Sequence, residues 1–454
     1  MLNSSCRGVR MANDFSRYLA ENSRFQSYLY SYPHKTAYRH FAEKIDLAGL
    51  WAPERRDALF LYAHIPFCEL KCAYCNLFTI SKPQAELVEH YLAQLRIEAE
   101  VLREVLGTFH FANYAVGGGT PSILSLTQLD RLFAIYTDVM GVDLQAVPGS
   151  FEVSPDTLDA EKIRYLAGRG IQRLSIGIQS FIEAEARAMG RVQPQAETDA
   201  LLEGIANAGF PVFNLDLIYG IAGQTEESWL ASLRRAVSFA PDELFLYPLY
   251  VRPLTALHRK TVALATHADI RPRLYALACD FLQASGYVQD SMRLFRSAGK
   301  TVPRSNEYSC QEDGMIGLGV NARSYTRDVH YSTEYAVAKA NVAAIVQQYV
   351  GKPRAAFAQA DYGIRLSEDD RRRRYLIKSI LKAQGLERTH YREVFGTDAT
   401  SDFPDLETLL QLGLAQQEGN FMRLTAEGMA HSDLIGHWFI SPEVRHKMQE
   451  YVPR

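Results

Sequence analysis

The chain has 454 residues, of which 47% are hydrophobic and 22% charged, and its formal net charge is −3. This length is enough for two or three domains, or for one large barrel with appendages. A net charge so close to zero gives no electrostatic reason to expect nucleic-acid binding. Because no run of about 18 apolar residues and no signal-peptide core are present, we expect a cytoplasmic protein without membrane contact.

The first fifty residues are polar and aromatic, and tyrosines are concentrated in Tyr28–Tyr38. Aromatic side chains at this density are typical of a segment that packs over a neighbouring surface. Contact with a substrate is the second possibility for the same segment. We therefore expect an arm that covers another part of the molecule.

Three of the six cysteines, Cys68, Cys72 and Cys75, follow one apolar run at the spacing C-x3-C-x2-C. The other three are scattered, which does not indicate a disulfide framework, and free thiols imply a reducing compartment. Soft thiolates on one short loop suit an iron–sulfur cluster, whereas a structural zinc site would need a fourth ligand nearby. Three cysteine ligands leave one iron of a four-iron cluster without a protein ligand, which favours a catalytic role for the cluster.

From Leu59 onward short apolar runs alternate with segments of helical periodicity. The expected strands are Leu59–Ile65, Phe111–Val116, Gly149–Ser154, Arg173–Ile178, Val212–Ile218 and Glu243–Leu249. The expected helices between them are Pro83–Leu106, Leu126–Met140, Thr157–Ala167, Ala196–Ala208 and Glu226–Phe239. This succession predicts an α/β fold, a barrel or partial barrel of parallel strands with helices outside and chemistry at the carboxyl ends of the strands.

Each expected strand runs into residues that suit ligand binding. The first leads to the cysteines, and the second leads to Gly117–Ser122, whose glycines let backbone N–H groups approach a ligand closely. The remaining strands end near Glu152, Gln179, Asp216 and Tyr247–Tyr250. Because Glu152 and Asp216 lie in apolar runs, each either has a buried partner or accepts hydrogen bonds from a polar ligand. Arg191 could pair with a ligand carboxylate or lie on a helix surface.

After about residue 355 the pattern changes to helices. The expected elements are Ser367–Ala383, a segment around Tyr391, Asp405–Leu412, an apolar hairpin that leads into Leu424–Gly428, and a final helix. The basic run Arg371–Arg374 follows a helix-start signal and is expected to be a solvated helix face. With the chain near neutrality, we favour a lid or substrate wall over DNA binding for this region.

Four motifs in this order resemble a radical S-adenosylmethionine (SAM) enzyme. They are Cys68-x3-Cys72-x2-Cys75, Gly117-Gly-Gly-Thr-Pro121, Arg173-Leu-Ser-Ile-Gly-Ile-Gln-Ser-Phe181 and Asn214-Leu-Asp-Leu-Ile-Tyr-Gly220. More closely, they are similar to the oxygen-independent coproporphyrinogen III oxidase family, which also contains haem chaperones and radical C-methylases. The resemblance runs from about Tyr62 to Tyr325, includes Asp313–Gly319, and is weaker toward the C-terminus.

The resemblance implies a partial (β/α)6 barrel, similar to a TIM barrel, that holds a 4Fe–4S cluster and two SAM molecules side by side. It divides the chain into an N-terminal arm over the active site at residues 1–50 and a barrel with its extension at residues 51–355. A small helical, winged-helix-like domain then occupies residues 356–454.

The family pattern also implies site residues. Cys68, Cys72 and Cys75 match the cluster ligands, and the first SAM chelates the open iron. Tyr62, Gly118 and Glu152 match contacts to this first SAM, with Tyr62 and Glu152 as the catalytic candidates. Positions that line the second SAM are Tyr74, Gly119, Thr120, Gln179, Arg191 and Asp216, with looser matches at Tyr250 and Arg323.

The chain departs from the oxidases within this family at one position. They carry a further cysteine two places after the last ligand, where this chain has Leu77. The sequence also has no obvious arginine-rich patch for a polyanionic tetrapyrrole, although five separate arginines could assemble one: Arg252, Arg293, Arg296, Arg304 and Arg323. We therefore place methyl or methylene transfer from the second SAM to an unreactive carbon ahead of oxidative decarboxylation of coproporphyrinogen III in haem biosynthesis.

The alternative to an enzyme is a binding protein, a haem-binding chaperone with the same fold. It needs an axial ligand outside the cluster, for which His64, His34 and Cys310 are the candidates. The radical SAM interpretation implies a small-molecule substrate and a reducing protein such as flavodoxin or ferredoxin. A monomer without nucleic acid is expected.

Overall fold

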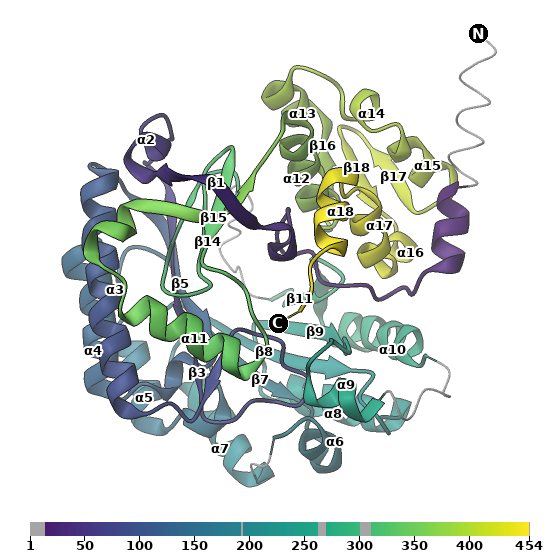
Figure 1. Ribbon diagram of the computed structural model, residues 1–454. Helices are drawn as coiled ribbons and strands as arrows, with labels where there is room; N and C mark the ends of the chain where they lie inside the picture. The colour runs from purple at the N-terminus through teal and green to yellow at the C-terminus, as the bar shows by residue number, and fades with distance from the viewer. Residues whose placement is uncertain (1–13, 192–193, 262–268, 300–309, 454) are drawn as a thin grey trace.

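The structure is a computed structural model that describes residues 14–191, 194–261, 269–299 and 310–453 (Figure 1). Its centre is a run of six parallel strands that hydrogen-bond to one another in chain order. They are β2 (Leu59–Ile65), β5 (Phe111–Gly118), β6 (Gly149–Val153), β7 (Arg173–Gln179), β8 (Val212–Tyr219) and β9 (Glu243–Pro248). All six expected strands are confirmed, with ends that shift by two residues at most.

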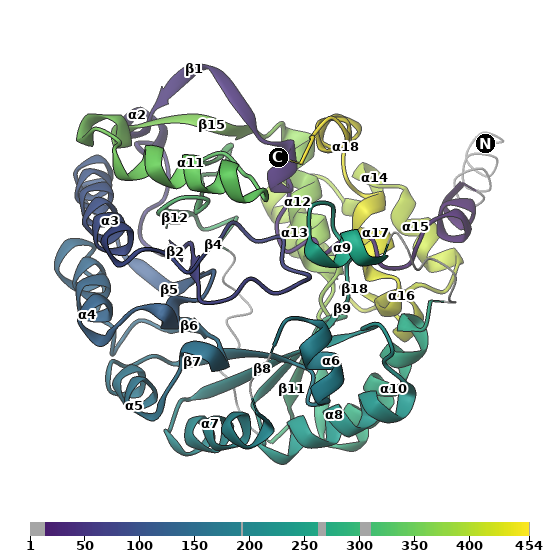
Figure 2. The same ribbon diagram turned by 60° about the horizontal axis from the view of Figure 1, so that its bottom comes forward.

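Helices cover the outer face of these strands, as the periodicity predicts (Figure 2). They are α3 (Ala85–Leu106), α4 (Leu126–Ala134), α5 (Ala160–Gly168), α7 (Gln195–Asn207) and α8 (Glu226–Ser238). A further short helix, α6 (Glu183–Ala188), follows β7 and was not expected. The end of the expected helix Leu126–Met140 is a π-helical turn, η3 (Ile135–Val139), that continues α4. Other short elements near the barrel are α9 (Ala256–Thr261), α10 (Arg271–Ala284) and the two-stranded pair β3 (Phe67–Cys68) with β4 (Ile80–Ser81).

Alternation within the strands separates a helix-covered face from an inner face. In β8, Leu215 and Leu217 are fully buried. Asn214 and Asp216 occupy the alternate positions, and successive side chains of a strand point to opposite faces of a sheet. Apolar residues therefore pack under the helices, while polar residues of the same strand line the inner face, which we call the lumen.

Further strands extend the sheet on both sides to thirteen, in the order β1-β15-β14-β13-β12-β2-β5-β6-β7-β8-β9-β11-β10. The added strands are β1 (Arg39–Asp46), β10 (Tyr287–Gln289), β11 (Leu294–Ser297), β12 (Met315–Leu318), β13 (Arg323–Tyr325), β14 (Val329–Ser332) and β15 (Gln359–Arg365). Strand β12 joins β2 in parallel, and the others pair antiparallel. The two end strands, β1 and β10, do not pair with each other, so the barrel is open.

The large sheet includes strands that lie outside the expected barrel domain, residues 51–355. Strand β1 lies before residue 51 and β15 lies after residue 355, yet the two pair with each other in the large sheet. Helices α2 (Leu47–Trp51) and α11 (Lys339–Val350) and the turn η5 (Arg354–Ala358) accompany them. These strands escape sequence analysis because β1 is an edge strand with a mostly exposed pattern and the others are short.

The C-terminal domain begins at α12 and consists of helices with a small antiparallel sheet, as expected. Its elements are α12 (Glu368–Ile380), β16 (Leu386–Glu387), α13 (Arg388–Phe395), α14 (Ala399–Asp402), α15 (Asp405–Gln411), β17 (Ala415–Glu418), β18 (Phe421–Leu424), α16 (Ala426–Ala430), α17 (Ser432–Trp438) and α18 (Pro442–Gln449). The expectation of a solvated basic face on α12 is wrong for Arg374, which is 1% exposed and pairs with Glu312 at 2.9 Å. No helix in the described part of the chain is both long and apolar enough to span a membrane.

The N-terminal segment, residues 14–38, runs beside the C-terminal domain (Figure 1). The Tyr32 hydroxyl donates to Asp370 at 2.8 Å, and Ser441 donates to the same carboxylate at 2.8 Å. The turn η1 (Lys35–Ala37) then leads into β1. We call residues 14–38 the arm; it packs over neighbouring surfaces, as its aromatic composition predicts.

A buried ion pair joins the barrel to the C-terminal domain. Arg293 and Asp433 lie 2.6 Å apart, with side chains only 4% and 2% exposed. The Tyr250 hydroxyl also donates to Asp433, at 2.5 Å. Because a lone buried charge is costly, loss of either partner leaves the other unsatisfied.

Substitution Asp433→Ala should lower the free energy of unfolding by about 3–5 kcal/mol, because Arg293 then stays buried without its partner. Guanidinium denaturation followed by circular dichroism measures it. The control Glu183→Ala breaks an exposed pair with Arg187 and should cost less than about 1 kcal/mol. Equal losses in the two variants would contradict the structural role of the Arg293–Asp433 pair.

Candidate functional site

The three cysteines lie on a loop at the carboxyl end of β2. Cys68 ends the short strand β3, and neighbouring segments hold the loop from two sides. The Ala73 N–H donates to Met189 O at 3.1 Å, and the Leu257 N–H donates to Ala73 O at 2.8 Å. Cys68 is buried, and Cys72 and Cys75 are half-buried, so the thiols are placed where a metal cluster is shielded but reachable.

The thiols suit a polynuclear cluster better than a single ion. Burial raises the pKa of Cys75 to about 12, with further upward effects from Cys72 and Cys68. Such close thiols stay deprotonated only with a bound cation. Among the described residues no three His, Cys, Asp or Glu side chains converge on one metal position. This agrees with a cluster, because each thiolate then binds a different iron.

The glycine-rich end of β5 packs directly against the cysteines. The Gly119 N–H donates to Ile65 O at 2.8 Å, and Thr120 Oγ1 donates to Cys68 Sγ at 3.4 Å. A Cβ on Gly119 would lie 2.6 Å from Phe67 O and 2.9 Å from Cys68 Sγ. Glycine at position 119 is therefore required by packing against the cysteine strand, whatever contact it makes with a cofactor.

Tyr62 and His64 form a hydrogen-bonded pair inside the barrel. The Tyr62 hydroxyl lies 3.1 Å from His64 Nδ1, and His64 Nε2 lies 3.3 Å from Phe78 O. Because a carbonyl only accepts, Nε2 carries the proton and Nδ1 accepts from Tyr62. Burial lowers the pKa of His64 to about 4, so the ring is neutral. Both ring nitrogens are thus engaged, which leaves His64 unsuited to be an axial haem ligand.

Glu152, at the end of β6, accepts a hydrogen bond from the Gly118 N–H at 3.1 Å. A Cβ on Gly117 would lie 2.7 Å from Glu152 Oε2, so glycine there makes room for the carboxylate. Burial raises the pKa of Glu152. No cationic side chain among the described residues forms an ion pair with it.

Asp216, on β8, is also a carboxylate that has a hydrogen-bond donor but no ion-pair partner among the described residues. Asn214 Nδ2 donates to Asp216 Oδ1 at 2.7 Å, and burial raises the pKa of this carboxyl to about 7. The nearby Arg173 pairs with Glu243 at 2.7 Å instead. The structure therefore brings Glu152 and Asp216 into the lumen, each with a hydrogen-bond donor and neither with an ion-pair partner among the described residues.

Tyr74 belongs to the cysteine loop, and Arg191 follows Gly190, where an added Cβ would lie 3.5 Å from Cys72 Cα. The charges of Cys72 and Tyr74 raise the pKa of Arg191 against the effect of burial. Arg191 also pairs with Asp156 at 3.2 Å, so the protein itself supplies one carboxylate partner. Gln179 adopts a φ of 72° at the end of β7, a strained conformation for a non-glycine residue that is typical of functional sites.

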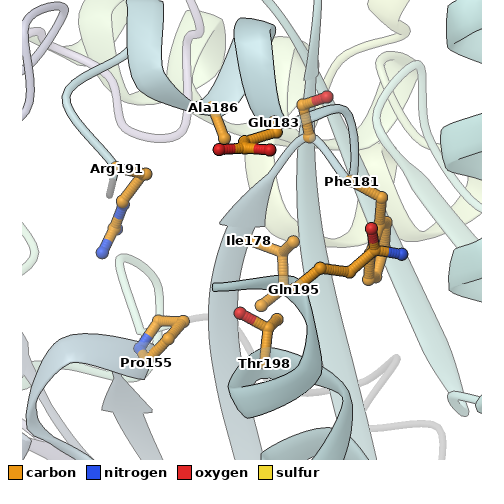
Figure 3. A pocket seen from close by; sticks show the side chains of 9 residues that line it. Pro155, Ile178, Phe181, Glu183, Ala186, Arg191, Gln195 and Thr198 are labelled. Carbon is orange, nitrogen blue, oxygen red and sulfur yellow. The ribbon is translucent and has the colours of Figure 1, made fainter. Parts of the chain in front are cut away.

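A small cavity of about 40 Å³ lies beside Arg191, bounded by Pro155, Ile178, Glu183 and Gln195 (Figure 3). This volume is enough for water but not for a nucleoside. The cavity is therefore not the cofactor site.

Tyr250 and Arg323, the two looser matches to the family pattern, contact residues outside the cysteine loop. The Tyr250 hydroxyl bonds to Asp433 and Arg293 at the C-terminal domain. Arg323 donates to Ser31 of the arm at 2.8 Å and stacks on Tyr30, with 4.8 Å from its guanidinium carbon to the ring centroid. Their expected contact with a second SAM stays a prediction.

Of the five arginines expected to form a substrate patch, two are already paired. Arg293 binds Asp433, and Arg296 lies 3.2 Å from Glu243. Arg304 falls outside the described residues. The sequence analysis did not predict that Lys35, on the arm, is a buried cation. The tyrosine-rich stretch around it indicated only that this segment covers another surface.

Comparison with known proteins identifies the family to which a chain with this fold and these motifs belongs. Residues 62–236 match the Radical SAM superfamily, and residues 366–431 match the HemN C-terminal domain. The oxygen-independent coproporphyrinogen III oxidase of Bradyrhizobium diazoefficiens is 30% identical over 362 residues, 75% of this chain and 78% of the relative. The heme chaperone HemW of Bacillus subtilis is 27% identical over 380 residues, 81% and 95% of the two chains.

A solved structure agrees over nearly the whole molecule. The coproporphyrinogen III oxidase (HemN) from Escherichia coli, described as a radical SAM enzyme, aligns with a TM-score of 0.79 and 27% identity. The alignment covers 90% of this chain and 96% of that one. This chain therefore belongs to the oxygen-independent coproporphyrinogen III oxidase family of the radical SAM superfamily.

Proposed function

We propose that this protein is an enzyme that generates a 5′-deoxyadenosyl radical in the lumen and uses it on a bound substrate. The observation that carries this proposal is the position of the cysteine loop: Cys68 accepts a hydrogen bond from Thr120 just after β5, and the nearby Gly118 N–H holds the Glu152 carboxylate of β6. A cluster on Cys68, Cys72 and Cys75, with SAM bound, supplies the one-electron chemistry.

The chain's own residues bind and orient SAM. Glu152, held by the Gly118 N–H, can accept hydrogen bonds from hydroxyl or ammonium groups of the first SAM. Tyr62 is fixed by neutral His64 and presents a rigid phenol on the neighbouring strand. The surrounding apolar strands exclude water, which protects a reactive radical.

A second SAM is part of this proposal. Asp216 is a second lumen carboxylate without an ion-pair partner in the described chain. Gln179 ends the neighbouring strand β7, Tyr74 lies on the cysteine loop, and Arg191 lies beside that loop. An anionic Asp216 would stabilise a sulfonium or ammonium group in the lumen. The family resemblance supports this role for the same residues.

For the reaction on the substrate, we propose oxidative decarboxylation of coproporphyrinogen III first. The oxidases of Bradyrhizobium diazoefficiens and Escherichia coli align with most of this chain, which supports this order. In that reaction a hydrogen atom leaves a propionate side chain, carbon dioxide departs, and one electron passes to an external acceptor. Arg252 and Arg323 form no ion pair in the described chain and offer partners for carboxylates.

Methyl or methylene transfer from the second SAM is the second candidate. The observation that favours it is Leu77, which is 43% exposed beside the cysteine loop where the oxidases carry a further cysteine. A haem-binding role is the third, since a heme chaperone aligns with 81% of this chain. Reduction by a flavodoxin- or ferredoxin-like protein belongs to either enzymatic candidate.

Replacement of Cys68, Cys72 and Cys75 by alanine should abolish cluster binding, because no other described thiols lie on this loop. Iron and sulfide analysis with electron paramagnetic resonance after anaerobic reconstitution measures it. Cys279→Ala, on α10, is the control and should keep the full cluster. A triple variant that still binds four irons would rule out these ligands.

Substitution Asp216→Asn should weaken SAM binding by about tenfold or more, because a charge-assisted interaction worth about 1.5–3 kcal/mol is lost. The pKa of Asp216 is about 7, so the anionic form grows as pH rises from 6 to 8. Equilibrium dialysis should therefore show tighter SAM binding at pH 8 in the wild type and no such gain in the variant.

S-adenosylhomocysteine, which has no sulfonium charge, is the matched control for that titration. Its binding should change little between pH 6 and 8 in either protein. An unchanged SAM affinity in Asp216→Asn would remove Asp216 from the SAM site. An identical pH gain for both ligands would place the Asp216 charge at the ammonium group, which both ligands carry, and would contradict a contact with the sulfonium.

An assay with SAM that carries a deuterated methyl group distinguishes decarboxylation from methyl transfer. With coproporphyrinogen III as substrate, decarboxylation predicts release of carbon dioxide and no deuterium in the 5′-deoxyadenosine. Methyl transfer instead predicts deuterium in the 5′-deoxyadenosine together with S-adenosylhomocysteine, and would reverse our order. Stoichiometric haem binding without cleavage of SAM would favour the chaperone.

A further inference from the structure

Glu185, on the short helix α6, is a buried carboxylate that the proposed chemistry does not use. It is 5% exposed, and no cation among the described residues forms an ion pair with it. Its partners are neutral donors: Ser180 Oγ at 2.6 Å, Gln224 Nε2 at 3.0 Å and Ser228 Oγ at 2.5 Å. Because a buried carboxylate is costly, three donors for this one indicate that the fold holds the side chain in one place.

The three donors come from three different parts of the barrel. Ser180 directly follows β7, Gln224 lies in the turn after β8, and Ser228 is in the first turn of α8. The Gly220 N–H donates to Gln224 Oε1 at 2.6 Å, which turns the amide group of Gln224 toward Glu185. Glu185 therefore ties α6 to two strand ends and to a neighbouring helix.

Helix α6 needs such ties because it is too short to be stable by itself. It has six residues, and its N-cap, Ile182, makes no side-chain capping hydrogen bond. Isolated helices of this length are not stable in water. Just beyond the helix, Met189 packs with Ile218 and Leu257 in a small apolar cluster. Glu185 and Met189 are thus a polar and an apolar anchor for α6.

The residues that follow α6 contact the cysteine loop directly. The Met189 carbonyl accepts a hydrogen bond from the Ala73 N–H at 3.1 Å, and an added Cβ on Gly190 would lie 3.5 Å from Cys72 Cα. The Met189 N–H donates in turn to Glu185 O at 3.1 Å. One helical turn therefore connects the anchored Glu185 to the loop that carries the cysteines.

The residues on either side of α6 belong to the expected second SAM site. Gln179, with its φ of 72°, immediately precedes Ser180, and Arg191 follows the helix. An added Cβ on Gly177 would lie 2.5 Å from Gln179 Nε2 and 3.6 Å from Arg191 Nη2, so both side chains lie over this glycine. A shift of α6 would therefore move Arg191 and the cysteine loop relative to Gln179.

We propose that Glu185 is a positioning residue that, through α6, fixes the place of the cysteine loop relative to the ends of β7 and β8. It touches none of the reacting groups and acts through Met189 and Ser180. Radical chemistry needs the cluster and SAM at fixed distances, and a misplacement of about 1 Å can cost about a hundredfold in rate. The consequence for SAM cleavage rests on the proposed function, whereas the placement of the loop does not.

Hydrogen–deuterium exchange of the reconstituted holoprotein, measured by mass spectrometry, tests the placement of the loop. Glu185→Leu fills the site with an apolar side chain of similar helix propensity. Peptides that cover residues 69–77 should then exchange about tenfold faster, because Met189 is no longer held in place. If simple packing were the role of position 185, leucine would serve it as well as glutamate does. Glu183→Leu, at an exposed position of the same helix, is the matched control and should exchange as the wild type does.

The yield of 5′-deoxyadenosine from SAM is measured on the same proteins. Glu185→Leu should lower it about tenfold or more, while iron content and circular dichroism stay as in the wild type. Glu185→Gln is the conservative variant and should keep wild-type exchange and yield. Its Oε1 still accepts from Gln224 Nε2. The Ser228 hydroxyl, which also lies 3.2 Å from Thr225 O, can turn to accept from the new amide.

Ser228→Ala provides a milder test, because it removes one donor and leaves Glu185 in place. Its loop peptides should exchange about threefold faster than those of the wild type. If Glu185→Leu does not fold, this variant decides the matter, and unchanged exchange in Ser228→Ala would overturn the proposal.

The two proposals can fail separately. Wild-type loop exchange in a folded Glu185→Leu, or equal acceleration in Glu185→Gln and Glu185→Leu, would overturn the positioning role. Faster loop exchange with a wild-type yield of 5′-deoxyadenosine would overturn it too, as would loss of iron in Glu185→Leu, which would assign α6 to cluster retention. A wild-type protein that never forms 5′-deoxyadenosine would overturn the radical function, and the exchange result would still decide whether Glu185 holds the loop.

Discussion

A charge inside a protein needs a partner, and the interior of this barrel contains charges that its own side chains do not pair. Glu152 and Asp216 line the lumen without a cationic partner among the described residues, while Lys35 is buried without an anion there. Elsewhere the molecule pairs its buried charges carefully, as Arg293 with Asp433 and Arg374 with Glu312 show. Other buried carboxylates, such as Glu185 and Asp370, are satisfied by several neutral hydroxyl and amide donors of the protein itself. Glu152 and Asp216 differ because they line the lumen, where a ligand can complete their hydrogen bonds.

The architecture explains why these charges meet. Parallel strands end at one edge, so residues from β2, β5, β6 and β8 converge although they are far apart in the sequence. Because the sheet is not closed, the lumen also needs covering elements. The arm contacts Arg252 after β9 and Arg323 on β13, and the Arg293–Asp433 pair connects the C-terminal domain to the barrel, so both are placed to act as such covers.

The parts of this arrangement that follow from local pattern were predictable. The six parallel strands have long apolar runs, and the spacing of Cys68, Cys72 and Cys75 predicts a metal site on the loop after the first of them. Strands β12 to β15 could not be predicted, because short antiparallel strands carry too little periodicity. Nor could the pairing of Arg293 with Asp433, or the burial of Lys35, since each depends on contacts between elements distant in sequence.

The most direct test of the radical function is the yield of 5′-deoxyadenosine from the reconstituted protein. The protein is incubated anaerobically with SAM and dithionite, and the nucleoside is quantified against the iron bound. A SAM-cleaving centre on Cys68, Cys72 and Cys75 predicts about one or more molecules per cluster in the wild type and none when Cys72 is replaced by alanine. A wild-type protein with a full cluster and bound SAM that forms no 5′-deoxyadenosine would contradict it.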